Sequence, residues 1–413
     1  MKAKTKKILN IVFPIILSVI IFFAGFLVGN TILDKDTRAL RDILDKYKRY
    51  YLYEEENVLD IITESIFDQY SKYYSKEEYD EIVKSAKGYK SGIGITIDKT
   101  INKITSVIYN SPCEYAGVES GGIIKEMYVN DNKVSNIYDN LTSIKIGDKV
   151  KLIVYYSCTL RDFTITKQEY IQTYVRYFDV TGEYGFRGSN SVVYEKISET
   201  TNIVDEKVGY IKYSSFSGKV SGIQGSVGQL KSVLNTFVTT NKEHLIFDLR
   251  GNGGGYMDIL EEVAGMLLPA SNGGQYKIAY AKDKFGKEEI FKSKKVTFEN
   301  YNIKKLTILA NSGSASASEV LIGAILDYSL SYNNCDVKVI ISDENSSNTS
   351  TYGKGIMQTT YVNLDGSAVK LTTAKLYSPL TNKSIHGIGF SPEYDGRISV
   401  CGESEILSIA QQI

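Results

Sequence analysis

Three alternating serines in the stretch 311-NSGSASASEV-320, Ser314, Ser316 and Ser318, could supply a nucleophile, because small residues surround them and a helix-forming run follows at once. A hydroxyl at the start of a helix lies near free backbone N–H groups, which stabilise negative charge. The same position also suits a serine that only caps the helix, so both interpretations stand. A nucleophile needs a base, and the chain has only two histidines, His244 and His386.

A lysine further along the chain is the alternative base. In 352-YGKGIMQ-358, Lys354 lies between two glycines, and Gln358 follows it on the same side of the chain. A lysine acts as a general base when burial lowers its pKa from ~10.4 to ~7–8, and serine–lysine pairs are a known form of activated nucleophile. An exposed loop lysine is the other interpretation of this segment.

A glycine run after an apolar strand, 245-LIFDLRGNGGGY-256, could hold an anion or an oxyanion through its backbone N–H groups. The dinucleotide-binding pattern would need glycine at position 256, which is Tyr256, and the P-loop pattern is absent. A plain tight turn explains the run equally well.

The composition excludes some classes of function. Lys+Arg and Asp+Glu both total 48, so a broad nucleic-acid-binding surface is not expected. The four cysteines form no C-x-x-C pair, which argues against a thiolate metal site and leaves free thiols or a disulfide. They are Cys113, Cys158, Cys335 and Cys401.

The N-terminus predicts a membrane anchor. Residues 8–29 carry no charge after a lysine-rich start, and as a helix they would span about 33 Å, enough to cross a bilayer. A cleaved signal peptide would have a shorter apolar run and a small-residue cleavage site. We therefore expect residues 1–30 to be a single-pass anchor with a cytoplasmic start, and the remainder to lie outside the cell membrane.

Hydrophobic periodicity divides the rest of the chain. Residues 31–90 show helical spacing, and residues 91–170 change to a period of two with turn residues between short β-branched runs. Strand and helix patterns then alternate through residues 171–413, which predicts an α/β core with mostly parallel strands. Within it, the polar segment 180–206 is expected to be a linker or an irregular crossover. The polar segment 329–350 is expected to be a surface insertion or a loop that reshapes the cleft.

Together these motifs resemble the C-terminal processing peptidases, also called tail-specific proteases. The segments DLRGNGGG, NSGSASASE and YGKGIMQ are followed in order by 363-NLDGSAVKLTTAKLYSP-379 and 384-SIHGIGFSPE-393. The resemblance covers most of the chain after the anchor and implies an α/β protease core with an inserted β-rich PDZ-like domain. It implies a serine endopeptidase that cleaves unstructured or C-terminal regions of extracytoplasmic proteins.

The resemblance also implies the roles of individual residues, with no metal or cofactor. Ser316 would be the nucleophile, Lys354 the general base and Gln358 the partner that orients the lysine. The remaining implied roles are oxyanion donation by the N–H groups of Gly254 and Ala317, and support by Asp327. Neither His386 nor His244 is expected to be catalytic.

The PDZ-like region is expected to recognise substrates. The segment 92-GIGI-95 resembles a carboxylate-binding loop, so N–H groups of Ile93, Gly94 and Ile95 would bind flexible apolar C-termini. Gly121-Gly122 replaces the usual Gly-Asp, so we expect the module either to bind tails weakly or to serve mainly as a lid. Family analogy suggests a homodimer. Two alternatives remain: a membrane-anchored binding scaffold without activity, and a small-molecule esterase.

Overall fold

The computed structural model describes residues 35–50, 58–187, 193–218, 225–343 and 349–412. The chain forms two compact units, Met1–Ile66 and Phe67–Ile413. The first unit contributes helices α2 (Lys35–Tyr50) and α3 (Val58–Ile66). Within the described ranges, no helix has the length and apolar character that crossing a membrane requires. The predicted anchor, residues 8–29, lies outside those ranges.

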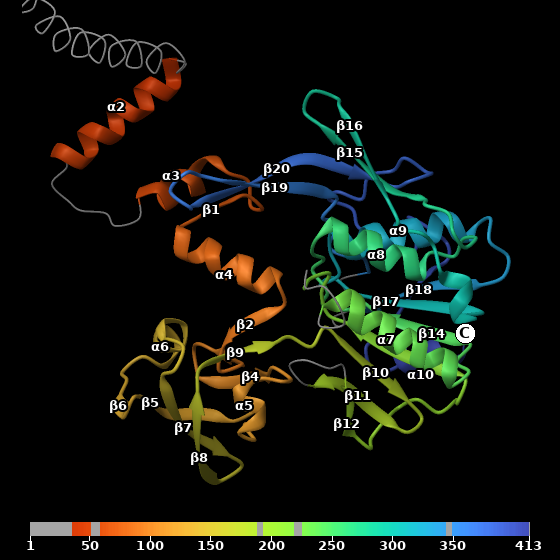
Figure 1. Cartoon of the computed structure of the whole chain (residues 1–413), viewed down its shortest axis with the longest axis horizontal. Helices are drawn as coiled ribbons and strands as arrows, with labels where there is room; N and C mark the ends of the chain where they lie inside the picture. Colours follow the sequence, from red (N-terminus) through yellow and green to blue (C-terminus); the bar gives the residue numbers. More distant parts are fainter. Residues whose placement is uncertain (1–34, 51–57, 188–192, 219–224, 344–348, 413) are drawn as a thin grey trace, which may run out of the picture. The chain divides into compact units, whose positions relative to one another are not determined.

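An antiparallel sheet with two short helices makes up the β-rich module of the second unit (Figure 1). Burial alternates along its strands, as in β7, because one face packs on a small core that includes Ile104, Met127 and Leu152. The elements are β3 (Ile95–Asp98), β4 (Lys103–Val107), α5 (Pro112–Tyr115), β5 (Ile123–Val129), β6 (Asn132–Lys133), α6 (Ile137–Ser143), β7 (Lys149–Tyr156) and β8 (Thr159–Thr166).

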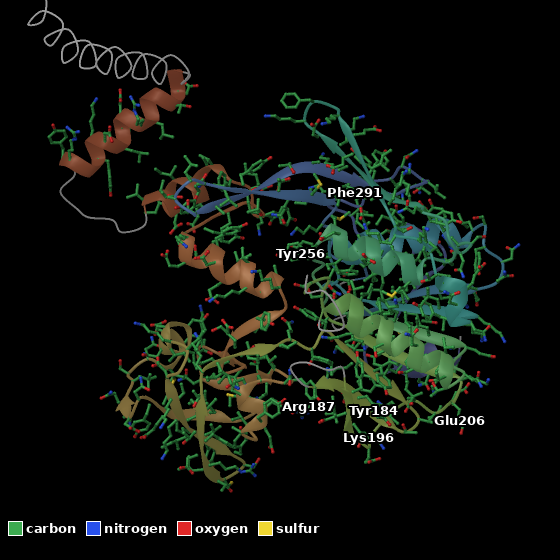
Figure 2. All side chains as sticks on the ribbon, in the orientation of Figure 1. Tyr184, Arg187, Lys196, Glu206, Tyr256 and Phe291 are labelled. Carbon is green, nitrogen blue, oxygen red and sulfur yellow. The ribbon has the colours of Figure 1, made fainter. Side chains whose placement is uncertain are left out.

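A two-stranded ribbon connects this module to the core. Strand β2 (Tyr89–Gly92), which follows helix α4 (Lys76–Ala86), pairs antiparallel with β9 (Gln168–Ile171). A second link is the bidentate contact of Arg187, labelled in Figure 2, with Glu114 at 2.7 and 2.9 Å. The ribbon and this ion pair together join the module to the protease-like core.

The core is a mixed sheet of order β12-β11-β10-β13-β14-β17-β18-β21. Its strands from β13 to β21 are parallel, and β14 is buried along its whole length, as expected for a parallel strand covered on both faces. The strands are β10 (Val175–Asp179), β11 (Gly182–Arg187), β12 (Val193–Ser198), β13 (Val208–Tyr213), β14 (His244–Asp248), β17 (Lys305–Ala310), β18 (Asp336–Asp343) and β21 (Ile398–Gly402).

Helices cover both faces of this sheet. The larger core cluster joins one face to α7 (Ser226–Thr239), α8 (Met257–Leu267) and α9 (Ala317–Ser329). A smaller cluster joins the other face to α10 (Ile406–Gln412). The short 3-10 helix η1 (Phe298–Tyr301) precedes β17.

A second, smaller sheet carries the lysine segment. Its central strand β20 pairs antiparallel with β1, β15 and β19. The outermost strand, β16, pairs antiparallel with β15. The strands are β1 (Lys72–Tyr74), β15 (Lys277–Asp283), β16 (Glu288–Lys292), β19 (Ile356–Val362) and β20 (Ala368–Tyr377).

The predicted α/β alternation of the core is confirmed, but two expectations about polar segments are wrong. Residues 180–206 are not a linker, because β11 and β12 extend the core sheet there. Within residues 329–350, the segment 336–343 is strand β18, which lies between β17 and β21 in the core sheet and not in a surface insertion. Strands β11 and β12 form despite their polar composition because they pair with each other and with the preceding strand β10, whereas β18 pairs with strands that are distant in the sequence.

Candidate active site

Two neighbouring strand ends bring the glycine run and the serine turn together. Strands β14 and β17 are parallel and adjacent, so the turns that follow them lie at the same edge of the sheet. The Ala315 N–H donates to the carbonyl of Asn252 at 3.0 Å, and the Ser318 hydroxyl donates to the same carbonyl at 2.8 Å. The two turns therefore form one bonded unit.

Ser316 occupies a strained position at the start of α9. Its φ of 57° and ψ of −116° lie outside the regions that residues with a side chain prefer. Such a conformation costs about 1–3 kcal/mol and persists only where surrounding contacts impose it. A sharp strand-to-helix turn of this kind exposes a nucleophilic hydroxyl in serine hydrolases.

Gly254 approaches this turn so closely that a side chain would not fit. A Cβ atom at Gly254 would lie 2.8 Å from the Ala317 nitrogen and 2.9 Å from the Ser316 Cβ, and the φ of Gly254 is 100°. Its own N–H donates to Asn252 Oδ1 at 2.9 Å. The predicted oxyanion donor is therefore occupied in this structure, while Ala317 N–H has no acceptor among the described residues.

Glu319 connects the serine turn to the lysine segment. Its carboxylate accepts hydrogen bonds from Ser316 N (2.9 Å), Lys354 N (2.9 Å), Gly353 N (2.7 Å) and the Thr351 hydroxyl (2.6 Å). The side chain is fully buried. Burial raises the pKa of the Glu319 carboxyl above its ordinary value of 4.5, and these donors partly oppose the increase.

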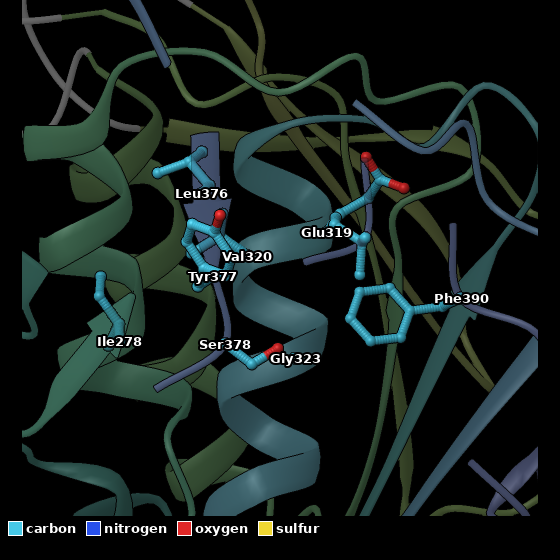
Figure 3. Close-up of a pocket in the computed structure, with 9 residues that line it drawn as sticks. Ile278, Glu319, Val320, Gly323, Leu376, Tyr377, Ser378 and Phe390 are labelled. Atoms are coloured by element: carbon cyan, nitrogen blue, oxygen red, sulfur yellow. The ribbon is translucent and has the colours of Figure 1, made fainter. Parts of the chain in front are cut away.

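A small cavity of about 20 Å³ lies beside Glu319 on α9, as Figure 3 shows. Val320, Gly323 and Phe390 contribute to its wall, so one side of the glutamate stem faces apolar groups. The carboxylate is therefore stabilised almost entirely by the four donors, and no cation pairs with it among the described residues.

The half-buried Lys354 side chain faces Gln358. Lys354 Nζ donates to Gln358 Oε1 at 2.8 Å, and Gln358 Nε2 donates to the carbonyl of Tyr70. Burial, and then Lys370, lower the pKa of Lys354 below its ordinary value of 10.5, whereas Asp68 and Glu319 act in the opposite direction. Among the described residues, no hydrogen bond joins Lys354 Nζ to the Ser316 hydroxyl.

A cavity of about 460 Å³ opens beside the serine. Both Ser316 and Gln358 line it, and so do Tyr256 and Phe291, which Figure 2 labels. The other apolar side chains that line it come from α8, β19 and β20: Met257, Ile356, Met357 and Leu376. Two acidic residues, Asp258 and Glu289, complete the wall. The cavity can hold an extended peptide segment against the serine.

A buried ion pair supports the glycine turn. Asp248, the last residue of β14, is fully buried and accepts hydrogen bonds from the Arg250 guanidinium at 2.7, 3.0 and 3.1 Å, from Arg250 N at 2.8 Å, and from the Tyr210 hydroxyl. Arg250 also reaches Glu403 at 2.6 Å. These contacts fix the start of the turn that carries Gly254.

Other residues singled out from the sequence lie away from the serine. Asp327 is buried on α9 and accepts hydrogen bonds from the N–H groups of Leu380 and Thr381, so it supports a loop. His244 is buried on β14, bonded to the Thr307 hydroxyl at 2.8 Å, and burial lowers its pKa to about 4. His386 packs edge-on against Tyr70.

The predicted tail-binding residues lie in the β-rich module. Gly94 has a φ of 89°, and its carbonyl accepts from Ile108 N, while the Ile93 carbonyl accepts from Cys113 N. Ile95 begins β3 opposite Val107. The described part of the chain provides no backbone acceptor for the N–H groups of Ile93 and Gly94.

Sequence reasoning missed Glu319 and Tyr70. The S-x-x-E spacing of Ser316 and Glu319 is the signature of a helix capping box, so a local signal for the glutamate existed. Tyr70 had no such signal, because it reaches the lysine only through tertiary contacts. The described residues contain no group of three or more side chains suited to a metal ion, and all four cysteines are free thiols.

Comparisons with known proteins agree with this arrangement. Residues 207–395 match the model of Peptidase family S41. A "Probable CtpA-like serine protease" of Staphylococcus epidermidis is 29% identical over 322 residues, which are 77% of this chain and 55% of that protein. The chain thus spans about half the length of the first curated relatives that it matches.

A more distant relative is the "Carboxyl-terminal-processing protease" of Picosynechococcus, 25% identical over 325 residues, which cover 77% of this chain and 67% of that protein. A solved structure, the photosystem II D1 C-terminal processing protease, aligns with a TM-score of 0.47 and 19% identity over 87% of this chain and 86% of that chain. The family model and the curated relatives agree: residues 207–395 match Peptidase family S41, and the chain is similar to the C-terminal processing peptidases.

Proposed function

We propose that the protein is a serine endopeptidase with Ser316 as nucleophile and Lys354 as general base. The observation that carries the proposal is the Glu319 carboxylate, which bonds the backbone N–H groups of both residues beside one cavity. In this structure Lys354 Nζ donates to Gln358 Oε1. Catalytic hydrogen bonds often tighten only when substrate binds, so the missing serine–lysine bond does not oppose the proposal.

The reaction has two halves. Neutral Lys354 takes the proton of the Ser316 hydroxyl, the oxygen attacks the peptide carbonyl carbon, and the protonated lysine then gives its proton to the leaving amine. In the second half Lys354 activates a water molecule that cleaves the acyl-enzyme. The Ala317 N–H stabilises the oxyanion, and the Gly254 N–H joins it by exchanging its bond to Asn252 for one to the oxyanion.

Substrate recognition is the second part of the proposal. The β-rich module would act as a PDZ-like domain that binds a flexible apolar C-terminus through the N–H groups near Ile93, Gly94 and Ile95. The apolar wall of the cavity suits an unfolded segment that then passes Ser316. Residues 8–29 would anchor the protein in the cell membrane as a single span, with the peptidase on the extracytoplasmic side.

The test uses the full-length chain, purified in mild detergent, and an unfolded protein with an apolar C-terminal tail. We expect cleavage by the parent and none by Ser316→Ala or Lys354→Ala, with the fragments identified by mass spectrometry. Tail binding without cleavage by the parent would favour the binding scaffold, and cleavage of small esters alone would favour the esterase. Unchanged cleavage by Lys354→Ala would refute the assignment of the base.

A further inference from the structure

An aromatic side chain from a distant part of the sequence covers the proposed base. The Tyr70 ring centroid lies 5.2 Å from Lys354 Nζ, within the range of a cation–π contact. The backbone carbonyl of the same residue accepts the hydrogen bond from Gln358 Nε2. Tyr70 therefore contacts both the lysine and the residue that orients it.

The segment that carries Tyr70 is fixed to the sheet next to the lysine strand. Asp68 Oδ1 accepts hydrogen bonds from Tyr70 N at 3.1 Å and Ser71 N at 2.7 Å, which closes a tight turn. The Ser71 hydroxyl accepts from Thr372 N at 3.0 Å, and β1 then pairs with β20. The ring position is thus imposed by backbone bonding on both sides of Tyr70.

The contact affects the balance between the two protonation states of the lysine. The electron-rich face of an aromatic ring attracts an ammonium group but not a neutral amine. Of the charged groups around Lys354, Asp68 before β1 and Glu319 on α9 also favour the ammonium, whereas Lys370 on β20 and burial disfavour it. The titratable groups near Tyr70 itself include Tyr352, Asp68 and His386.

We propose that Tyr70 is a positioning residue for the base: its ring retains the Lys354 ammonium, and its carbonyl holds Gln358 in place. This inference rests on the proposed function. The ring sets the pH at which the lysine becomes a base, and the carbonyl fixes the Gln358 amide that accepts the hydrogen bond from Lys354 Nζ. The hydroxyl group of Tyr70 is not needed for either effect.

The sign of the effect follows from the contact. Removing the ring destabilises the ammonium relative to the neutral amine, so the lysine loses its proton at lower pH. A cation–π contact of ordinary strength corresponds to a shift of about 0.5–1.5 pH units. Because the carbonyl belongs to the backbone, a side-chain substitution at position 70 leaves the bond to Gln358 available.

The experiment measures kcat/KM for a peptide substrate from pH 5 to pH 10 with the full-length chain and its variants. In Tyr70→Leu we expect the acid limb of the profile to move down by about 0.5–1.5 pH units, while in Tyr70→Phe it stays where the parent has it. Tyr70→Met is a second variant in case leucine impairs folding. The position of the limb does not depend on the fraction of folded enzyme.

The outcomes separate this inference from the proposed function. An unchanged limb in both Tyr70→Leu and Tyr70→Met would overturn the role of the ring, and an equal shift in Tyr70→Phe would assign the effect to the hydroxyl instead. Lys354→Ala, measured in parallel, tests the base itself: if it keeps the parental rate, the proposed function fails and the Tyr70 inference fails with it. Loss of activity in Lys354→Ala with no shift at Tyr70 would overturn this inference alone.

Discussion

The two turns that meet at the candidate active site are each held by a buried carboxylate, but the two carboxylates are stabilised differently. Asp248 supports the glycine turn and is neutralised by the Arg250 guanidinium. Glu319 supports the serine turn and accepts three backbone N–H groups and one hydroxyl. An ion pair fixes one turn to the sheet, whereas uncharged donors let Glu319 connect the two segments that contain the proposed nucleophile and the proposed base.

The two turns are therefore expected to affect different properties, one the folding stability and the other the reaction rate. A charge pair that is broken from one side leaves an uncompensated buried charge, so its loss affects folding first. A carboxylate that orders backbone groups around a nucleophile and a base affects geometry first, and small displacements of reacting groups are costly to the rate. We therefore expect mutations at Asp248 to act mainly on stability and mutations at Glu319 mainly on turnover.

The largest expected effect is that of Asp248→Ala. It leaves the Arg250 side chain, only 12% exposed, without its buried partner, and we expect a loss of about 3–5 kcal/mol in the free energy of unfolding. Urea denaturation measures this loss.

The matched control is Glu403→Ala, which removes the other partner of Arg250. Glu403 is 49% exposed, so we expect a change of at most about 1 kcal/mol. Equal losses of stability in the two variants would show that the buried ion pair stabilises the fold no more than the exposed one.

The next largest effect is the pH dependence of stability that His244 introduces on strand β14. Its pKa is about 4 in the folded chain against 6.5 ordinarily, so the unfolded chain binds the proton more tightly. Stability should therefore fall by about 3 kcal/mol as the pH decreases from about 6.5 to about 4. Thermal unfolding across this pH range measures the loss.

His244→Asn should remove most of this acid-dependent loss, while His386→Asn, which leaves β14 intact, should retain it. Glu319 on the serine turn gives stability the opposite pH dependence. Its pKa is raised in the folded chain, so its contribution to stability is present below about pH 4.5 and is lost as the pH rises through the pKa of the folded state. An acid loss that persists unchanged in His244→Asn would contradict the assignment.

The third effect is that of Glu319→Gln on activity. An amide has one oxygen, so its NH₂ group must face one of the two pairs of donors that the carboxylate accepts. We expect kcat/KM to fall about 100-fold, which corresponds to about 2.7 kcal/mol, because one of the two donor pairs loses its acceptor and the serine and lysine segments shift relative to each other. Steady-state kinetics on folded protein measure the loss.

Ser318→Ala is the control for the serine turn. It removes a buried hydrogen bond to the Asn252 carbonyl but leaves the contacts of Glu319 intact. We expect a loss of about 1 kcal/mol in stability and less than a tenfold loss in kcat/KM. If Glu319→Gln lowered stability as much as Asp248→Ala and left kcat/KM unchanged, the contrast between the two turns would be false.

Much of the core could be predicted from the sequence. Buried strands such as His244–Asp248 and Lys305–Ala310 are short apolar runs that end in turn residues, and the helices after them show helical spacing. Strand β18 could not be predicted in this way, because its register is set by β17 and β21, and its polar flanking residues suggested a loop. Local patterns report what a segment prefers, whereas pairing depends on distant residues.

The same division applies to the site. The sequence by itself determined the residue types at the two turns and the order in which Gly254, Ser316, Lys354 and Gln358 follow one another. Only the tertiary structure decided that the Gly254 N–H is occupied, that Glu319 binds both segments, and that Tyr70 covers the lysine. The physical reason is that hydrogen bonds and ring contacts act over a few ångströms, and Tyr70 comes within that distance of Lys354 only when β1 pairs with β20.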